Sequence, residues 1–368
     1  MKENQSQLTL SQMFFVILQA VTGIGVLTLP YDIYTVSKED SWITILFSGL
    51  IIGIGVLIMW LLLRRFPTLT IFEMVNEIVG LYLGSFLKII YILFFLYTPI
   101  CIVLAFSYLL NIWILPETPI WVNTFLILGI SVYCAKKKLK VIARFFTTVS
   151  LLFLVLFFLI SYVLRDVEFL YLLPIGKNGL QNIIKGLPKS SVAFSGFEAI
   201  LIIFPYSMGN SLQKLKVSIM ALGVVTIFYA YSAVVCITFF GPSIMRFMPQ
   251  PILYALKFQS FQIIERTDLL FFSIWTVSIA TSLIINLYIA ANGLANLFKR
   301  TTQSKFVPYA AVFIFLITLI VPQNKESINS IRQYYALASP IFFLILPGIL
   351  LILSFLQGKQ EPKREIRS

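Results

Sequence analysis

The chain has 368 residues, of which 59% are hydrophobic and 12% are charged, and it contains 28 Lys and Arg, 15 Asp and Glu and no histidine. Soluble domains are nearer about 45–50% apolar and about 25% charged, so the composition predicts a polytopic membrane protein. The lack of histidine excludes Ser–His–Asp triads, imidazole metal sites and histidine proton relays.

Ten apolar segments are expected to cross the bilayer as helices, for which roughly 20 residues suffice. They lie at about residues 10–36, 41–63, 84–113, 120–135, 144–164, 189–208, 217–241, 269–298, 306–322 and 336–356. The first, third and eighth are long enough to tilt or break. The N-terminus lacks the basic start of a signal peptide, so the first segment should stay as a span. We therefore expect an all-α fold and a single integral membrane domain over residues 1–368.

Every Lys and Arg can be placed outside the cores of these segments. With the N-terminus in the cytoplasm, 18 of the 28 basic residues lie on the cytoplasmic side and 10 on the other, most densely in AKKKLK at 135–140. This asymmetry follows the positive-inside rule and predicts that both ends, including a short basic tail at 357–368, are cytoplasmic. The positive charge suits anionic lipid headgroups, whereas six residues between two spans offer no nucleic-acid-binding fold.

The two longest loops, about 165–188 and 242–268, are expected on the outer side, and neither is long enough for a separate domain. The second loop mixes apolar and charged residues. It is either a short interfacial helix lying over the bundle or an ordinary extended loop.

Two of the segments contain a combination that suits a straight helix poorly: a hydroxyl residue, a glycine, an apolar run and then a proline. In the first segment it begins with Thr22, Gly23, Ile24 and Gly25 and ends at Pro30. In the sixth it begins with Ser195, Gly196, Phe197 and Glu198 and ends at Pro205. Ten spans divided into two sets of five, about 10–164 and 189–356, put these interruptions at matching positions, a pattern that points to a transporter-type binding site.

Glu198 is the one acid of the fifteen that lies well inside an apolar segment. A charge at that depth costs at least about 2.5–3.5 kcal/mol, and ionisable residues in such places mark functional sites by default. We therefore interpret Glu198 as a binding or gating residue. The alternative is a protonated glutamate that is hydrogen-bonded to neighbouring backbone.

An unwound helix exposes backbone N–H groups, with the positive end of a half-helix dipole, to an anionic group such as a carboxylate, and its free carbonyls can meet an ammonium group. The interruptions at 22–25 and 195–198 are therefore predicted to bind a small polar ligand. Broken backbone is tolerated at membrane depth only where it lines a cavity or is buried in protein. The alternative for the glycines is close packing of neighbouring helices.

Polar residues in the third and eighth segments are candidates for completing the cavity. They are Tyr97 in the third and Thr281, Ser282, Asn286 and Tyr288 in the eighth. Hydroxyl side chains in membrane helices often bond only to their own helix, which is the competing structural interpretation.

No enzyme, metal site or cofactor is expected. An intramembrane protease would need a His pair, a Ser–His or Ser–Lys arrangement, or two deep aspartates. The chain has no histidine and places neither a lysine nor a second acid deep in a span, and its three cysteines sit in or beside apolar runs, as in buried packing.

Four stretches, taken in order, identify a family. They are LTLSQMFFVILQAVTGIGVLTLP at 8–30, KKLKVIARFF at 137–146, FSGFEAILIIFPY at 194–206 and LYIAANGLANLF at 287–298. In these stretches the chain resembles the B subunits of endospore germinant receptors, the spore-germination permease-like branch of the amino acid–polyamine–organocation superfamily. The resemblance covers nearly the whole chain.

The resemblance implies a five-plus-five inverted-repeat fold, like that of leucine-transporter-type carriers, with broken helices 1 and 6. It implies a place in the spore inner membrane with an A-type membrane subunit and a lipoprotein C-type subunit. Carried over by position, residues 22–25 and 195–198 would form the ligand site. Sodium-binding members of the superfamily place hydroxyls on the eighth span, so Thr281 and Ser282 are a possible ion site.

The implied role is to sense a nutrient, often an amino acid, and to trigger germination through partner subunits. A secondary amino-acid transporter, coupled to protons or sodium, is the alternative. One cavity could serve either role, because both depend on a ligand that binds two conformations with different affinity.

Overall fold

The structure is a computed structural model in which residues 7–23, 25–259 and 266–361 are described. The regular structure of these residues is helical, apart from one β-bridge between Leu8 and Ser207, so the all-α expectation is confirmed. The α-helices are α1 (Leu10–Val21), α2 (Gly25–Ser37), α3 (Ser41–Arg65), α4 (Ile71–Val79), α5 (Leu81–Trp113), α6 (Ile120–Ala135), α7 (Leu139–Val149), α8 (Leu151–Tyr162), α9 (Gly179–Ser190), α10 (Ile200–Ile203), α11 (Ser211–Met245), α12 (Pro251–Phe258), α13 (Thr267–Leu297), α14 (Val307–Ile320), α15 (Lys325–Pro340) and α16 (Leu346–Leu356). Short 3-10 segments and one π-helical turn connect some of them.

Seven helical stretches among the described residues are long and apolar enough to cross a membrane, by length and composition. They are Gly25–Arg65, Leu81–Trp113, Leu139–Asp166, Ser211–Met245, Thr267–Leu297, Gln303–Ile320 and Lys325–Leu356. The first, fourth and sixth expected spans coincide instead with shorter apolar helices, Leu10–Val21, Ile120–Ala135 and Phe197–Tyr206. The first and sixth are short because each of these spans is divided in two.

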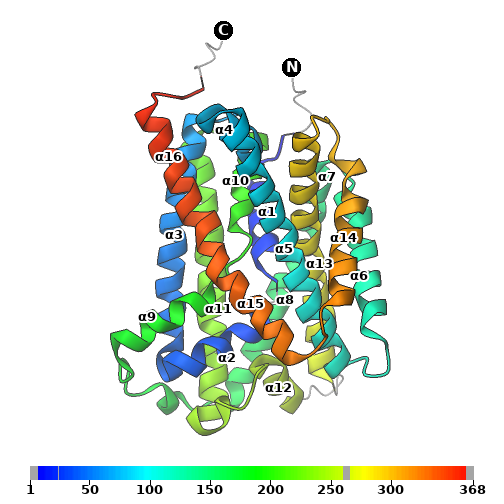
Figure 1. The fold of residues 1–368 in the computed structure, drawn as a ribbon. Coiled ribbons are helices and arrows are strands. Elements are labelled where there is room, and N and C mark those ends of the chain that lie inside the picture. Colours follow the sequence, from blue (N-terminus) through cyan, green and yellow to red (C-terminus); the bar gives the residue numbers. More distant parts are fainter. Residues whose placement is uncertain (1–6, 24, 260–265, 362–368) are drawn as a thin grey trace.

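The first span breaks between α1 and α2, as predicted. α1 begins in a capping box formed by Thr9 and Gln12, and it ends where Thr22 leaves the helical region with ψ at 75°. α2 begins at Gly25 and runs across the lower part of the bundle, inclined to α1 (Figure 1). The two halves therefore do not share an axis.

The sixth span also breaks, but its first half lies earlier in the chain than the sequence predicted. That half is α9, and the segment expected at 189–208 contains only its last residues. The expectation failed because the polar residues of α9, such as Gln181 and Lys185, were assigned to an outer loop. The helix is amphipathic and packs its buried residues on α2 and α3, which explains why its apolar signal is weak.

The segment 242–268 contains the short helix α12 among its described residues, and its position at a membrane interface stays a prediction. α11 turns at Gly241, where φ is +67°, just before Pro242. α12 then buries Ile252, Leu253 and Leu256 against the bundle. The remaining residues of this prediction, 260–265, lie outside the described ranges.

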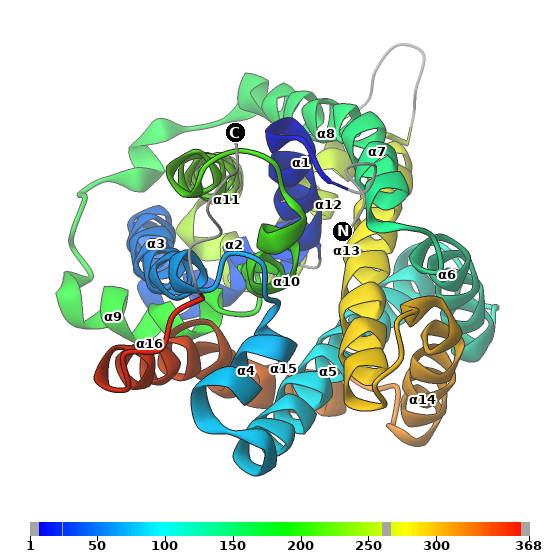
Figure 2. The same ribbon diagram turned by 90° about the horizontal axis from the view of Figure 1, so that it is seen from above.

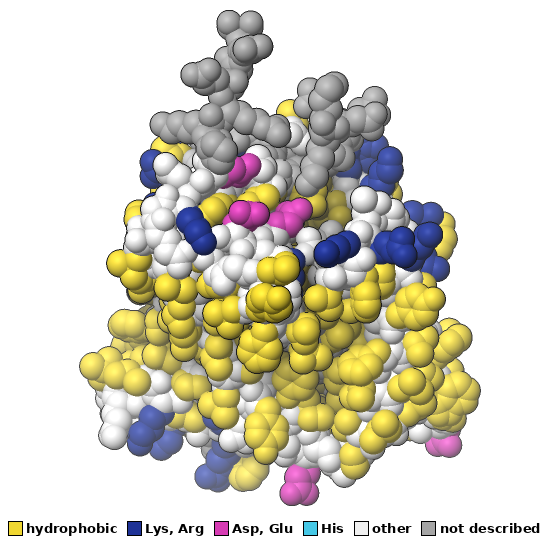
Figure 3. All heavy atoms as spheres, turned by 45° about the horizontal axis from the view of Figure 1, so that its top comes forward, with side chains coloured by type: hydrophobic (Ala, Val, Ile, Leu, Met, Phe, Trp, Pro, Cys, Tyr) yellow, Lys and Arg dark blue, Asp and Glu magenta, His cyan; other side chains and the backbone are white. Residues whose placement is uncertain are grey.

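The two broken spans lie in the middle of the bundle. Seen from above, α1 and α10 are central, with α3 and α11 on one side and α5 and α13 on the other, while α6 and α14 lie further out (Figure 2). On the face shown in Figure 3, a broad band of hydrophobic side chains crosses the molecule, and Lys and Arg side chains gather above it at the end where α16 finishes. This distribution fits a chain that is embedded in a membrane.

Asp40 fixes the loop that precedes α9. The side chain is fully buried at the start of α3. Its Oδ1 accepts a hydrogen bond from the Gly176 backbone N–H at 2.8 Å, and its Oδ2 accepts one from the Asn178 N–H at 3.0 Å. Hydrogen bonds to a charged acceptor are among the stronger ones in proteins.

Asp40→Ala is expected to lower the free energy of unfolding by about 1.5–3 kcal/mol, because two backbone N–H groups lose a charged partner. Limited proteolysis should also cleave near residues 173–179 sooner. Thermal unfolding of the purified protein measures the first effect, and mass spectrometry of the fragments measures the second. Glu117→Ala, which removes an exposed acid between α5 and α6, is the control. Equal behaviour of the two variants would contradict the role given to Asp40.

Candidate functional site

The two interruptions touch each other through glycine. Gly196 has φ at +115°, and a Cβ at this position would lie 2.5 Å from the Ala20 carbonyl oxygen. A Cβ on Gly25 would lie 2.5 Å from that of Ala193. Gly23 is less crowded, since its nearest neighbour would be Ser282 Oγ at 3.4 Å. Close packing, the alternative left open by the sequence, therefore describes Gly25 and Gly196 better than Gly23.

Side chains from other spans bind the carbonyls that the first interruption frees. Ser282 Oγ donates to the Ala20 carbonyl at 2.9 Å, and Trp275 Nε1 donates to the Gly23 carbonyl at 3.0 Å. The Tyr229 hydroxyl lies 3.1 Å from the Val21 carbonyl and 3.1 Å from that of Ala193. It therefore joins the two interruptions. Sequence reasoning missed Tyr229 and Trp275, although a polar aromatic tip inside a span needs a partner.

The remaining candidates from the first and sixth spans differ in position. Thr22 Oγ1 donates to the Leu18 carbonyl at 2.6 Å, so this hydroxyl caps its own helix. Ser195 lines the cavity described below, and Phe197 is buried in the core. Ile24 lies outside the described residues.

Glu198 is buried and bonded to the backbone of the second interruption. Its Oε2 accepts a hydrogen bond from the Gly196 N–H at 2.8 Å, and Ser339 Oγ on α15 lies 3.4 Å from its Oε1. These contacts match the alternative interpretation, in which the carboxyl group is hydrogen-bonded to neighbouring backbone. A role in ligand binding or gating stays a prediction.

The candidates on the third and eighth spans mostly bond to protein groups. The Tyr97 hydroxyl donates to the Ile331 carbonyl at 2.7 Å and so ties α5 to α15. Asn286 Nδ2 donates to the Ser282 carbonyl of its own helix at 2.8 Å. Thr281 and Tyr288 are buried, and the Thr281 hydroxyl donates to Gln19 Oε1 at 2.7 Å.

A small cavity lies where the interruptions meet. Its volume is about 10 Å³, which is room for about one water molecule. The lining includes backbone and side chains of both interruptions and of α5, α13 and α15, among them Val21, Gly23, Cys101, Ser195, Ser282 and Tyr335. Three predicted site residues, Gly23, Ser195 and Ser282, are therefore brought together. In the described part of the chain, no three Cys, Asp or Glu side chains gather as a metal site would require.

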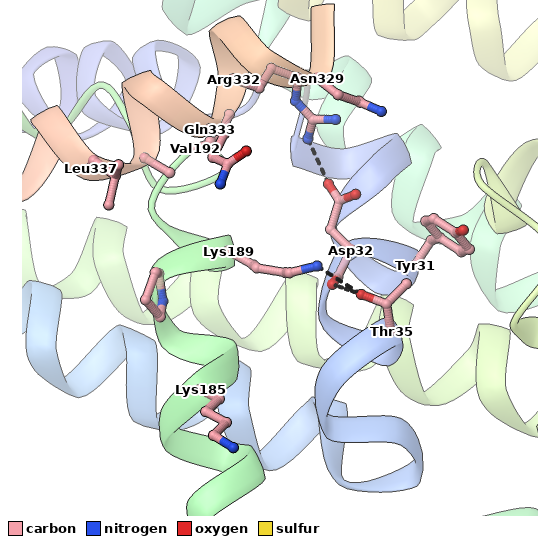
Figure 4. A pocket seen from close by; sticks show the side chains of 12 residues that line it. Tyr31, Asp32, Thr35, Lys185, Lys189, Val192, Asn329, Arg332, Gln333 and Leu337 are labelled. Carbon is pink, nitrogen blue, oxygen red and sulfur yellow. Dashed lines mark hydrogen bonds and ion pairs between the residues drawn. The ribbon is translucent and has the colours of Figure 1, made fainter. Parts of the chain in front are cut away.

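An ion pair lies between this cavity and a larger one, which is called the outer cavity because it lies toward the end of the bundle opposite the one where α16 finishes (Figure 1). Arg332 on α15 donates from Nη2 to Asp32 Oδ2 at 2.6 Å (Figure 4). The same nitrogen donates to Thr28 Oγ1 at 2.9 Å. The outer cavity, of about 570 Å³, lies between α2, α9 and α15 and includes both members of the pair. Arg332 also lines the central cavity. Arg332 therefore lines both spaces.

Sequence reasoning did not find the ion pair. It placed Asp32 near the outer end of the first span and Arg332 in the outer loop between the ninth and tenth spans, without pairing them. A second outer cavity of about 240 Å³, which reaches α5 and α12, also contains both residues. Arg332 therefore lines all three spaces, and Asp32 lines the two outer ones.

Comparison with known proteins gives a consistent family. Residues 7–328 match the family model described as spore germination protein. Spore germination protein YndE of Bacillus subtilis (strain 168) is 25% identical over 362 residues, 95% of this chain and 96% of the relative. Spore germination protein B2 of the same organism is 23% identical, covering 98% of both chains. Spore germination protein GerQB of Bacillus cereus is 22% identical, covering 92% of this chain and 93% of the relative.

A solved structure shares the fold. The crystal structure of MhsT in complex with L-phenylalanine superposes with a TM-score of 0.71, covers 95% of this chain and 89% of that chain, and is 14% identical in sequence. This similarity confirms the leucine-transporter-like fold with broken helices 1 and 6.

Gly196→Ala is expected to lower the stability of the protein by about 1–3 kcal/mol, because alanine disfavours φ near +115° and its Cβ would clash with the Ala20 carbonyl. Gly129→Ala on α6 is the control, since a Cβ there meets nothing within 4 Å. Thermal unfolding in detergent compares the two variants. If Gly196→Ala unfolds at the same temperature as the wild type, the interruptions do not touch as described.

Proposed function

The chain belongs to the spore germination protein family, and we propose that it is the membrane subunit of a germinant receptor, which binds a small nutrient, an amino acid, between its interrupted helices. The observation that carries this proposal is the cavity where the interruptions meet, which shares with the outer cavity the lining residue Arg332, the ion-pair partner of Asp32. The shared fold with MhsT, whose crystal structure contains L-phenylalanine, supports an amino acid.

Binding would require the central cavity to widen, since about 10 Å³ is too small for an amino acid. A nutrient carboxylate could replace Asp32 as the partner of Arg332. Its ammonium group could replace the Tyr229 hydroxyl or the Trp275 indole N–H as the partner of the carbonyl of residue 21 or 23. Breaking the ion pair would let α2 and α15 separate. A ligand that prefers the widened state shifts the population toward it, and that shift would be the signal.

The assembly is proposed by family resemblance. A receptor of this kind would join an A-type membrane subunit and a lipoprotein C-type subunit in the spore inner membrane. Both termini would be cytoplasmic, and the chain would form one membrane domain with repeats at about 10–164 and 189–356. The positions of the basic residues support this orientation.

A secondary amino-acid transporter remains the second candidate. The outer cavity, which leads toward interrupted helices, favours it, because substrate needs a route from water to the middle of the membrane. Uptake of labelled amino acid by the purified chain in liposomes would favour transport. Binding without uptake would favour the receptor subunit.

One compound in a panel of amino acids and sugars should raise the unfolding temperature of the purified chain, because it binds only the folded state. Ser195→Ala should weaken this binding at least about tenfold, since a lost hydrogen bond to a charged ligand group costs about 1.5–3 kcal/mol. Ser85→Ala is the control, because that hydroxyl bonds to its own helix. Equal affinities in both variants would contradict the site.

The natural Cys101 reports whether Arg332 closes the central cavity. This thiol is buried and lines that cavity, so it should react slowly with a small methanethiosulfonate reagent in a variant that lacks Cys134 and Cys236. Adding Arg332→Gln should speed the reaction at least about tenfold. This is the effect expected if loss of the ion pair makes opening of the cavity about 1.4 kcal/mol more favourable.

Mass spectrometry of the labelled protein measures that rate. Lys185→Gln is the matched control, because Lys185 lines the outer cavity but is not part of the ion pair. Identical rates for the two variants would show that Arg332 is not the barrier.

A further inference from the structure

A buried polar junction lies three residues before the first interruption. Gln19 on α1 is 2% exposed. Its Nε2 donates to Ser150 Oγ at 3.0 Å, and its Oε1 accepts from Thr281 Oγ1 at 2.7 Å. Ser150 stands between α7 and α8, and Thr281 is on α13. One amide therefore joins the first, fifth and eighth spans at membrane depth.

Each hydroxyl at the junction has further partners. Ser150 Oγ also lies 2.7 Å from the Phe146 carbonyl, and Thr281 Oγ1 lies 2.8 Å from the Ser278 carbonyl. A hydroxyl can donate or accept, so the junction persists even if the oxygen and nitrogen of the amide exchange places. The neighbouring Ser282 hydroxyl donates to the Ala20 carbonyl at 2.9 Å.

This geometry bears on the possible ion site at Thr281 and Ser282. A hard cation needs several oxygen atoms whose lone pairs converge on one point. At this junction the amide of Gln19 and the Thr281 hydroxyl are bonded to each other. The Ala20 carbonyl, which a cation could otherwise share, receives the Ser282 hydroxyl.

We propose that the Gln19 amide takes the place of a bound cation at this junction, so that the chain binds no sodium ion there. Gln19 is a positioning residue: its hydrogen bonds hold α1 against α7, α8 and α13, and so place residues 20–23 beside the central cavity. A carboxylate in place of the amide would create the missing negative charge of a cation site.

The test compares thermal unfolding of the full chain in nanodiscs in sodium chloride and in choline chloride at equal ionic strength. The wild type should unfold at the same temperature in both salts. Gln19→Glu should gain a saturable, sodium-specific rise of about 3 °C or more, because sodium would bind only the folded state. Gln357→Glu, at the exposed end of α16, is the matched control and should gain nothing.

Two results would overturn the inference. One is a sodium-specific, saturable stabilisation of the wild type that Thr281→Val or Ser282→Ala abolishes. The other is a folded Gln19→Glu protein that responds equally to both salts. The wild-type measurement decides the question even where Gln19→Glu does not fold. No nutrient is present in these experiments, so their outcome is separate from success or failure of the nutrient-binding proposal.

Discussion

Inside a bilayer every backbone N–H and C=O group needs a partner within the protein, and this constraint governs the two broken helices. The first interruption opens carbonyls at residues 20, 21 and 23, and side chains of α11 and α13 bind each of them. The Tyr229 hydroxyl reaches both interruptions. Side chains of other spans thus stabilise the interruption. Without them, the backbone groups of a helix in lipid would have to bond within the helix.

The sequence predicted the features that depend on local chemistry. Apolar length placed most spans, and glycine with proline in apolar runs marked both interruptions. It could not predict partners that are far apart in the chain: Arg332 and Asp32 are 300 positions apart, and Gln19 and Thr281 are 262 apart. The helical repeat of about 3.6 residues relates only residues that are close in the chain, so it carries no information on such pairs. The residues of α9 were wrongly assigned to a loop for a different reason, because the polar residues on one face of this helix resemble those of a loop.

Glu198 illustrates how a strong sequence signal can leave its role open. Its depth in an apolar segment marked it as functional, and the structure places its carboxyl on the Gly196 N–H, at the start of a half-helix. There the carboxyl stabilises the interruption directly and need not touch a ligand. The central cavity is lined instead by small and hydroxyl-bearing residues, with Arg332 at its outer side. For ligand binding, the shape of the central cavity and the position of Arg332 are therefore as important as Glu198.

A density map of the purified chain with its stabilising amino acid bound tests the central claim most directly. The account predicts density for the compound between residues 20–25 and 193–198, in a cavity wider than that described, with Arg332 moved from Asp32. Density for the compound at another place, beside an unchanged ion pair and an unchanged central cavity, would contradict it.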